Sequence, residues 1–434
     1  MRSINWTGAS FLLLVGISVA CSASKTDDNL FDNGSTATGG TGGVEPGASG
    51  AAGSDDGGGP PSGGSGASEG WDASVGNDPD ATGISNCQAG PDEDKDQDGY
   101  TINDGDCNDC DPNANPGAFD VVGGADGGAG VDEDCDGEID NEPMDCDNQP
   151  FAIDDNDAMN AAKSLGICRV ADPNGVGKGK TWGVLSAKYV LAGGFPGMNA
   201  MSHGLLPRFG ASGVQQGMNM LSLSSGTARA PNQAGYESPG GADMGTSGLP
   251  PAGYPKESPS CPGVVTGECN DPAALELEIR VPTNANSFSF NLNFYTYEFP
   301  NFICSEYNDF FVTMMTPIPS GLPDGNISFD QDGNPISVNN SMLQVCTPGS
   351  HGGKTFACPL GPALLDQTGF EDGHAATGWL QTRAPVEPGG VITLRFAIWD
   401  SGDHILDSTV LIDNFQWSVD PANAAETTPV PVPK

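Results

Sequence analysis

The sequence has few basic residues and few aromatic ones. Its 434 residues include 16 Lys and Arg against 57 Asp and Glu, which gives a formal net charge of −41. A chain of this charge repels nucleic acids and anionic membrane surfaces and attracts divalent cations, so nucleic-acid binding is excluded. Aromatic residues make up 7% of the chain, whereas Gly (63) and Pro (35) are abundant. Much of the chain therefore cannot bury a core.

Histidine is also scarce, and no catalytic motif contains one. All four histidines lie in loops rich in Gly or Asp, outside any HExxH motif or GxSxG elbow: His203, His351, His374 and His404. Loop histidines are usually only solvated, so we expect that the protein is not an enzyme. A secreted hydrolase that uses His404, beside Asp403 and Asp407, is the remote alternative.

Long apolar runs are missing as well. No segment approaches the roughly 20 apolar residues of a membrane-spanning helix. Residues 11–17 form a short apolar run after Arg2 and precede Ser18, Val19, Ala20 and Cys21. This pattern predicts an export signal over residues 1–20. Small residues before a cysteine resemble the bacterial lipobox, although Ser18 stands where Leu is usual, and the resemblance implies a lipid on Cys21. Signal cleavage without lipidation is the alternative.

Composition divides the exported chain into segments. A Gly- and Ser-rich stretch with almost no apolar side chains is typical of a disordered stalk. The Pro-rich end of the chain is typical of a disordered tail. We expect the following organisation: a stalk over 21–86, an acidic module over 87–147, a β-domain over 150–419 with a mobile loop over 228–262, and a tail over 420–434. The location that follows is an outer-membrane lipoprotein facing the cell surface, or a secreted protein.

The 12 cysteines predict disulfides, because an exported chain is oxidised and no paired CxxC spacing of a zinc site recurs. Setting Cys21 aside leaves an odd number, so one thiol lacks an intrachain partner. Two predicted bridges close short loops, and a third ties the acidic module to the β-domain: Cys261–Cys269, Cys346–Cys358 and Cys146–Cys168.

The acidic module carries two calcium-type motifs. In DKDQDGYT, carboxylates alternate at Asp94, Asp96 and Asp98 before Gly99, as in an EF-hand loop. Position twelve is Gly105 rather than Glu, so Asp104 or Asp106 is expected to supply the missing oxygens. In DEDCDGEID the same spacing recurs, with candidate ligands Asp132, Asp134, Asp136 and Asp140.

Calcium is the expected ion, because the candidate ligands are hard oxygens and the module contains no histidine. The alternative is a solvated acidic linker that binds no metal. The segments GYTINDGDCNDCDPNANPGA and VDEDCDGEIDNE together resemble the metal-binding motif of secreted bacterial MopE-type proteins. The insert FDVVGGADGGAG departs from that pattern, which usually has a Cys and a shorter link there.

The rest of the chain predicts mainly β structure. Apolar residues alternate over 275–281, 288–294 and 392–398, and an apolar run with Phe415 and Trp417 predicts a last strand over 409–417. The turns between are rich in Gly, Pro and Asn. The alternation shifts phase after Phe294, which predicts a bulge there. Residues 158–165 predict one capped helix after a run of acidic residues. The whole favours an antiparallel, jelly-roll-like β-sandwich.

Within this region, NSFSFNLNFYTYEFPNFICSEYNDFFV and LRFAIWDSGDHILDSTVLIDNFQW resemble the choice-of-anchor L domain of bacterial surface proteins, over about residues 158–419. The resemblance implies extracellular display and no particular reaction. Several carboxylates at expected strand ends form a possible second metal cluster: Asp309, Asp400, Asp403, Asp407 and Asp413. Simple capping of turns by these residues is the alternative.

The function expected from these features is a calcium-binding adhesion or ligand-binding lipoprotein. Its partner would be an extracellular ligand, such as a glycan, a matrix component or a neighbouring cell surface, and the lipid would hold it to the membrane. The alternative is a surface protein that sequesters metal through its acidic module.

Overall fold

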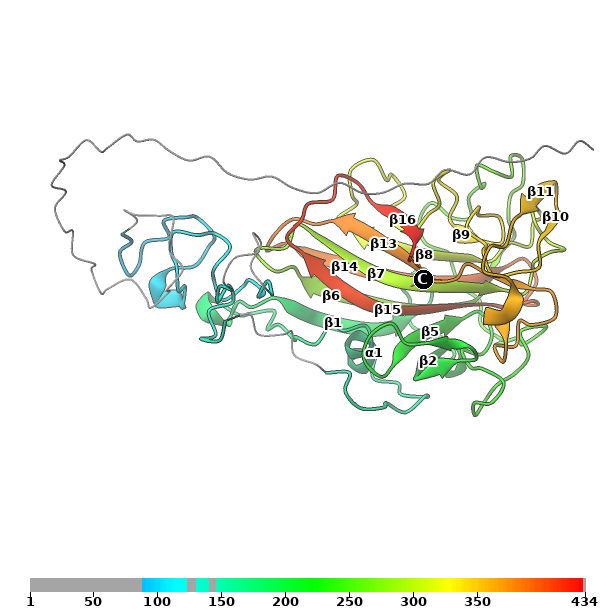
Figure 1. Cartoon of the computed structure of the whole chain (residues 1–434), viewed down its shortest axis with the longest axis horizontal. Helices are drawn as coiled ribbons and strands as arrows, with labels where there is room; N and C mark the ends of the chain where they lie inside the picture. Colours follow the sequence, from blue (N-terminus) through cyan, green and yellow to red (C-terminus); the bar gives the residue numbers. More distant parts are fainter. Residues whose placement is uncertain (1–87, 123–129, 140–145, 432–434) are drawn as a thin grey trace, which may run out of the picture. The chain divides into compact units, whose positions relative to one another are not determined.

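The computed structural model describes residues 88–122, 130–139 and 146–431 (Figure 1). The expected signal, Cys21, the stalk and Asp140 lie outside these residues. Among the described residues, no helix is both long and apolar enough to cross a membrane.

Two antiparallel sheets dominate the structure. The five-stranded sheet has the order β1 (Gly183–Val190), β6 (Cys269–Arg280), β14 (Val391–Ser401), β8 (Phe310–Thr316) and β9 (Ile336–Ser337). The seven-stranded sheet runs β16 (Glu426–Pro429), β13 (Leu380–Pro385), β7 (Ser287–Thr296), β15 (Ser408–Ser418), β5 (Met220–Ser224) and β2 (His203–Leu206), and β12 (Ala375–Ala376) also pairs with β7.

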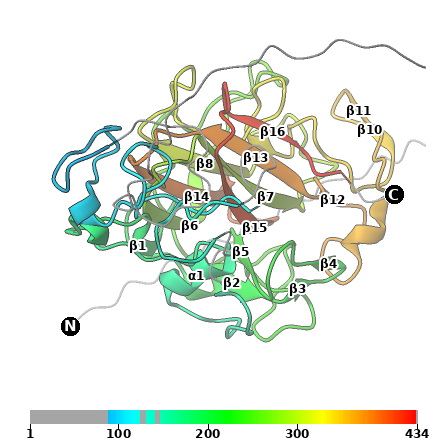
Figure 2. The same cartoon turned by 60° about the vertical axis from the view of Figure 1, so that its left-hand side comes forward.

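Shorter elements complete the fold. Two small hairpins pair β3 (Arg208–Phe209) with β4 (Ser212–Gly213) and β10 (Gly349–His351) with β11 (Lys354–Phe356). The helical segments are α1 (Ala158–Ser164) and the 3-10 turns η1 (Ile102–Asp104), η2 (Gly177–Gly179), η3 (Ala200–Ser202) and η4 (Pro362–Leu365). The helix α1 begins after Asp157, whose carboxylate accepts a hydrogen bond from the Met159 amide, and it lies beside β1 and β5 in both views (Figures 1 and 2).

The main core lies between the two sheets. Leu275, Leu277 and Ile279 of β6 share one buried cluster with Phe288 and Phe290 of β7. This arrangement follows from the alternation in the sequence, because every second side chain of each strand points to the same face. The predicted antiparallel β-sandwich is confirmed.

Strand β7 is buried on both faces, which corrects the predicted bulge at Phe294. Its pairing with β15 runs without interruption from Thr296 to Asn291. Phe294 belongs to the core between the sheets, and Tyr295 faces a second buried cluster with Phe209 and Phe370. The phase shift in the sequence therefore marks the burial of both faces rather than an inserted residue.

The sequence predicts a disordered tail over residues 420–434. This prediction is wrong in part, because the tail contains a strand. Residues Glu426–Pro429 form β16, which pairs with β13 at the edge of the seven-stranded sheet. The predicted loop over 228–262 contains no helix or strand, but it packs onto the sandwich. Its Tyr254 ring lies 5.5 Å from Trp399 and 5.7 Å from Phe310, so this loop contributes to the core.

Two of the three predicted disulfides are confirmed, Cys146–Cys168 and Cys346–Cys358. The predicted Cys261–Cys269 bridge is wrong, because Cys261 bonds Cys304 and Cys269 is a free, buried thiol. Cys269 begins β6 and packs among apolar side chains that include Trp399. A fourth bridge, Cys107–Cys135, joins the segment just after the first calcium-type motif to the second motif, and Cys110 is also disulfide-bonded.

Candidate metal centres

Five aspartates of the acidic module converge on a common space. The set is made of two overlapping triads that share Asp96, and in each triad three carboxylate oxygens lie within 4.8 Å of one another: Asp94, Asp96 and Asp109, and Asp96, Asp98 and Asp106.

Backbone amides orient all five carboxylates. The Gly99 amide donates to Asp94 at 3.1 Å, the Tyr100 amide to Asp98 at 2.8 Å, and the Asn108 amide to Asp106 at 2.8 Å. The Asp98 and Lys95 amides hold Asp96 and Asp109 in the same way, at 3.3 Å and 3.2 Å. In each of the five, the second oxygen is buried and accepts no hydrogen bond: Asp94 Oδ1, Asp96 Oδ2, Asp98 Oδ2, Asp106 Oδ2 and Asp109 Oδ2.

Burying these carboxylate oxygens without donors destabilises the folded state unless a cation or protons neutralise their charge. Burial, opposed in part by backbone hydrogen bonds and reinforced by neighbouring carboxylates, raises the pKa of Asp98 to about 7. The same causes raise the pKa of Asp106 to about 7. Buried oxygens that lack donors are the ligands that a hard divalent cation takes, so the donor set fits calcium.

The second motif repeats the local geometry of the first. Gly99 and Gly137 both have a positive φ, of 94° and 96°, and each donates its amide to the aspartate five residues earlier. Asp120, Asp132 and Asp134 bring oxygens within 4.8 Å of one another. However, Arg169 forms a 3.2 Å ion pair with Asp134, and both oxygens of Asp132 accept backbone amides. The second set is therefore already partly neutralised, and the first is the stronger candidate.

The structure brings only some of the predicted ligands together. Asp94, Asp96, Asp98 and Asp106 meet in the first set, and Asp132 and Asp134 in the second. Asp104 does not join them, because its carboxylate bonds the Thr101 hydroxyl at the start of η1. Asp136 lies outside both sets, where its Oδ1 accepts the Glu138 amide.

Sequence reasoning missed Asp109 and Asp120 as candidate ligands. Each comes from outside a DxDxDG motif and reaches its set through a fold-back of the chain. Asp109 accepts the Lys95 amide, and Asp120 accepts the Asp134 amide at 3.1 Å. The one available signal was the acidic GDCND run that follows the first motif.

The acidic module contacts the β-sandwich within one compact unit. The Phe119 amide donates to Asn284 at 3.1 Å, and the Asn284 amide group donates back to the Phe119 carbonyl at 2.7 Å. A cavity of about 330 Å³ opens at this contact. Its lining includes Asp98 and Tyr100 from the module and Lys180, Trp182 and Arg280 from the sandwich.

A second group of carboxylates is buried inside the sandwich. Glu298, Asp309, Asp400 and Asp407 are each at most 2% exposed. They come from the ends of strands in both sheets, since Glu298 follows β7, Asp309 precedes β8, Asp400 lies near the end of β14 and Asp407 precedes β15.

Residues 257–416 match the choice-of-anchor L domain family model. All four buried carboxylates lie inside this choice-of-anchor L segment, whereas the acidic module lies outside it. The match supports an extracellular or cell-surface protein. No curated protein and no solved structure matches the chain.

The other carboxylates predicted for this cluster have different roles in the choice-of-anchor L segment. Asp403 is exposed and accepts the amide of Ile405 at 3.1 Å, as a turn cap does. Asp413 is buried, but amides of Gln215, Gln216 and Asn414 satisfy its carboxylate. The turn-capping alternative fits Asp403, whereas Asp413 lies within β15 and its carboxylate is held mainly by amides from a distant loop.

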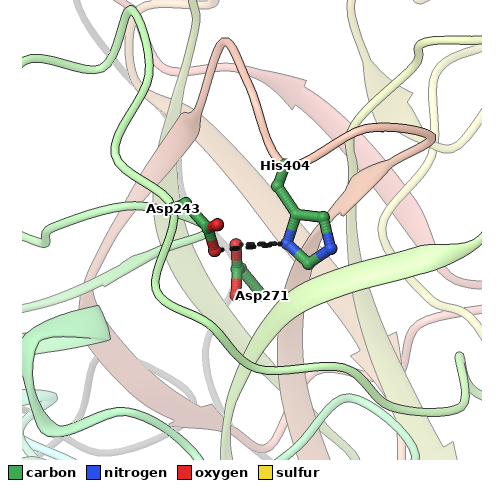
Figure 3. A group of neighbouring side chains, drawn as sticks. All are labelled: Asp243, Asp271 and His404. Carbon is green, nitrogen blue, oxygen red and sulfur yellow. Dashed lines mark hydrogen bonds and ion pairs between the residues drawn. The ribbon is translucent and has the colours of Figure 1, made fainter. Parts of the chain in front are cut away.

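His404 forms a separate ionic group at the edge of the choice-of-anchor L segment (Figure 3). Its Nδ1 lies 2.9 Å from Asp271 Oδ2 and 3.5 Å from Asp243 Oδ1. The amides of Met244 and Thr246 also donate to the Asp271 carboxylate. His404 therefore lies against carboxylates that already have donors, a structural arrangement that links the 228–262 loop to the β14–β15 connection.

Proposed function

We propose that this protein is a calcium-binding, ligand-binding lipoprotein displayed on the cell surface, without enzymatic activity. The observation that carries the proposal is the set of five carboxylates in the acidic module. Each is oriented through one oxygen by a backbone amide, and each has a buried second oxygen without a donor.

Several features support calcium as the ion. The ligands are carboxylates, the module contains no histidine, and oxygens alone form the triads. The chain's net charge of −41 raises the local concentration of divalent cations. An ion in this set would remove the repulsion between carboxylates that burial has brought together, so calcium is expected to stabilise the module.

The choice-of-anchor L match supports surface display, and disulfide use fits an oxidising compartment outside the cytoplasm. Attachment through a lipid on Cys21 is part of the proposal. Mass spectrometry of the mature protein tests it, and an unmodified Cys21 thiol, or a chain that starts after Cys21, would contradict it.

We place the external ligand in the cavity between the acidic module and the sandwich. Trp182 offers an aromatic surface, and Lys180 and Arg280 offer hydrogen-bond donors, a combination that suits a carbohydrate. Asp98 belongs both to this lining and to the carboxylate set. Ligand binding should therefore depend on calcium.

Calorimetric titration of the full chain tests the calcium site. Wild-type protein should bind calcium and become more resistant to protease within the module. Asp96→Asn should weaken binding at least about tenfold, because Asp96 belongs to both triads. The matched control is Asp111→Asn, an aspartate of the same module whose Oδ1 accepts the Asn113 amide as a turn cap. Wild-type protein that binds no calcium would overturn the proposal.

A glycan array probed with full-length protein, with calcium and with chelator, tests the ligand. The expected result is calcium-dependent retention that Trp182→Ala abolishes. Retention of metal without retention of any glycan would favour the alternative, a protein that sequesters metal at the surface.

A further inference from the structure

The cavity between the acidic module and the sandwich carries basic side chains in a strongly acidic chain. Lys180 and Arg280 both line it, and Asp98 is the one acidic residue among the described residues of the lining. The chain as a whole has 57 acidic residues against 16 basic ones. The formal charge of the cavity is therefore positive, opposite to that of the molecule around it.

Arg280 is held by backbone carbonyls rather than by an acidic partner. It ends β6, which is paired on both sides, with β1 and with β14. Its Nη1 donates to the Thr181 carbonyl at 2.9 Å and to the Asp172 carbonyl at 3.2 Å. Across the described part of the chain, no ion pair or hydrogen bond engages its Nε or Nη2. These two groups form the fork of donors that matches both oxygens of a carboxylate.

Lys180 presents a second cation without an acidic partner. The side chain is exposed, and its Nζ lies 5.8 Å from the centroid of the Tyr100 ring. The Tyr100 hydroxyl donates to the Lys180 carbonyl, which holds the two residues together. None of the ion pairs between described residues includes Lys180. Its amino group is therefore available to an anionic ligand.

Trp182 adds a flat surface and a third donor to the lining. Its Nε1 is buried and donates to no acceptor among the described residues. The Arg169 guanidinium lies 5.3 Å from the centre of the indole, and Trp417 meets it edge on with centroids 6.4 Å apart. These contacts fix the indole in place. An indole with apolar faces and one donor matches a sugar ring, which has C–H faces and polar hydroxyls.

A neutral sugar would leave the two cations uncompensated. A ligand that covers a guanidinium and an ammonium group removes water from them, and only an anion returns charge-assisted hydrogen bonds. The carboxylate of Asp98 repels such an anion while it is ionised. A calcium ion in the five-aspartate set would cancel that charge, so the calcium-loaded cavity favours an anionic ligand.

We propose that this cavity binds a carboxylated carbohydrate, a glycan with uronic acid units. The carboxylate lies against Arg280 and Lys180, and the sugar ring lies against Trp182. The inference rests on the proposed function, because it names the ligand class of the same site. The volume of about 330 Å³ is at the lower end of the range for small-molecule sites, about 300–1,000 Å³, so the cavity takes a short stretch of such a glycan.

Calorimetric titration of the full chain with a hyaluronan tetrasaccharide, at saturating calcium, tests the inference. This probe contains glucuronate, and its neutral counterpart is the same tetrasaccharide with each carboxylate reduced to an alcohol. Wild-type protein should bind the acidic form at least about tenfold more tightly, because hydrogen bonds between charged groups are the stronger ones. The preference should shrink as sodium chloride is raised at constant calcium.

Two substitutions separate charge from geometry. Lys180→Gln removes a cation from an exposed side chain, so the protein should fold, and the preference for the acidic form should fall at least about threefold. Arg280→Lys keeps the charge but loses the fork, so it should weaken the acidic form and leave the neutral form unchanged. The matched control is Lys178→Gln, an exposed lysine outside the lining, which should change neither affinity.

Equal binding of the acidic and neutral tetrasaccharides would overturn the inference and leave the proposed carbohydrate site in place. A preference that survives both Lys180→Gln and Arg280→Lys would overturn it as well. A hexaglutamate peptide that binds as tightly as the acidic tetrasaccharide would contradict the assignment to a carbohydrate. Absence of binding by either tetrasaccharide would also overturn the inference, and the glycan array then shows whether the carbohydrate site itself fails.

Discussion

At the scale of single residues, calcium binding should depend on the protonation of Asp98 and Asp106, whose pKa values burial raises to about 7. Without calcium, the folded state holds these protons more tightly than the unfolded chain does. The free energy of unfolding should therefore fall as the pH rises from about 4 to about 7. When calcium is present, protons compete with it for these carboxylates. The calcium affinity should therefore rise with pH over the upper part of this pH range.

Calorimetry measures this linkage directly. We expect the calcium affinity to rise roughly tenfold or more between about pH 5.5 and about pH 7.5, with protons released on binding. Titrations in two buffers of different ionisation enthalpy quantify the release. Equal apparent enthalpies in both buffers near the lower pH would contradict the prediction.

The individual ligands also differ in how far sequence reveals them. Asp94, Asp96 and Asp98 are held by hydrogen bonds that reach only two to five residues along the chain, so their spacing alone predicts their convergence. Asp109 reaches the same set across fourteen residues through the Lys95 amide. Asp104 is also an aspartate close in sequence to the first motif. Its carboxylate instead bonds the Thr101 hydroxyl at the start of η1.

At the scale of elements, β16 shows how a Pro-rich tail is held to a sheet. Thr427 is buried, its hydroxyl accepts the Phe329 amide at 3.3 Å, and it bonds the Thr382 hydroxyl at 2.9 Å. Thr427→Ala leaves the Phe329 amide without this acceptor. The free energy of unfolding should fall by about 1–3 kcal/mol in a denaturant titration.

The neighbouring Thr428 provides the control, because it lies in the same strand and is exposed. Thr428→Ala should change stability by no more than about 0.5 kcal/mol. Equal effects of the two substitutions would mean that β16 contributes only through its backbone.

Strand positions were predictable where the alternation was clear, as in β6 and β14, because pleating places alternate side chains on opposite faces. The pattern failed in β7 and β16 for different reasons. In β7, Phe294 and Tyr295 face two separate cores, which a single sequence cannot distinguish from a bulge. In β16, the partner strand β13 supplies the order that the tail's composition does not.

At the scale of the whole molecule, stability rests on the core between the sheets. The rings of Phe290 in β7 and Phe396 in β14 pack edge to face across it, with centroids 5.1 Å apart. Phe290→Ala should lower the free energy of unfolding by about 3–5 kcal/mol, through lost burial and the cavity left behind. Denaturant titration measures the loss.

Phe195→Ala is the corresponding control. Phe195 is 57% exposed, so its removal should cost less than about 1 kcal/mol. A similar loss for both variants would show that the main core does not lie where Phe290 and Phe396 meet.

The sequence by itself determined the properties that depend on composition and on near neighbours. These are the acidic charge, the DxDxDG register, the alternating strands and the bridges Cys146–Cys168 and Cys346–Cys358. The register and the strands follow from forces that act along a short stretch of chain, such as turn hydrogen bonds and the pleat of a strand.

Only the tertiary structure decided which distant residues share a space. It paired Cys261 with Cys304, left Cys269 free, and brought Glu298 and Asp309 to Asp400 and Asp407. Such contacts depend on strand order and register, which arise when two sheets bury a common core. The burial of these carboxylates is therefore a property of the folded sandwich.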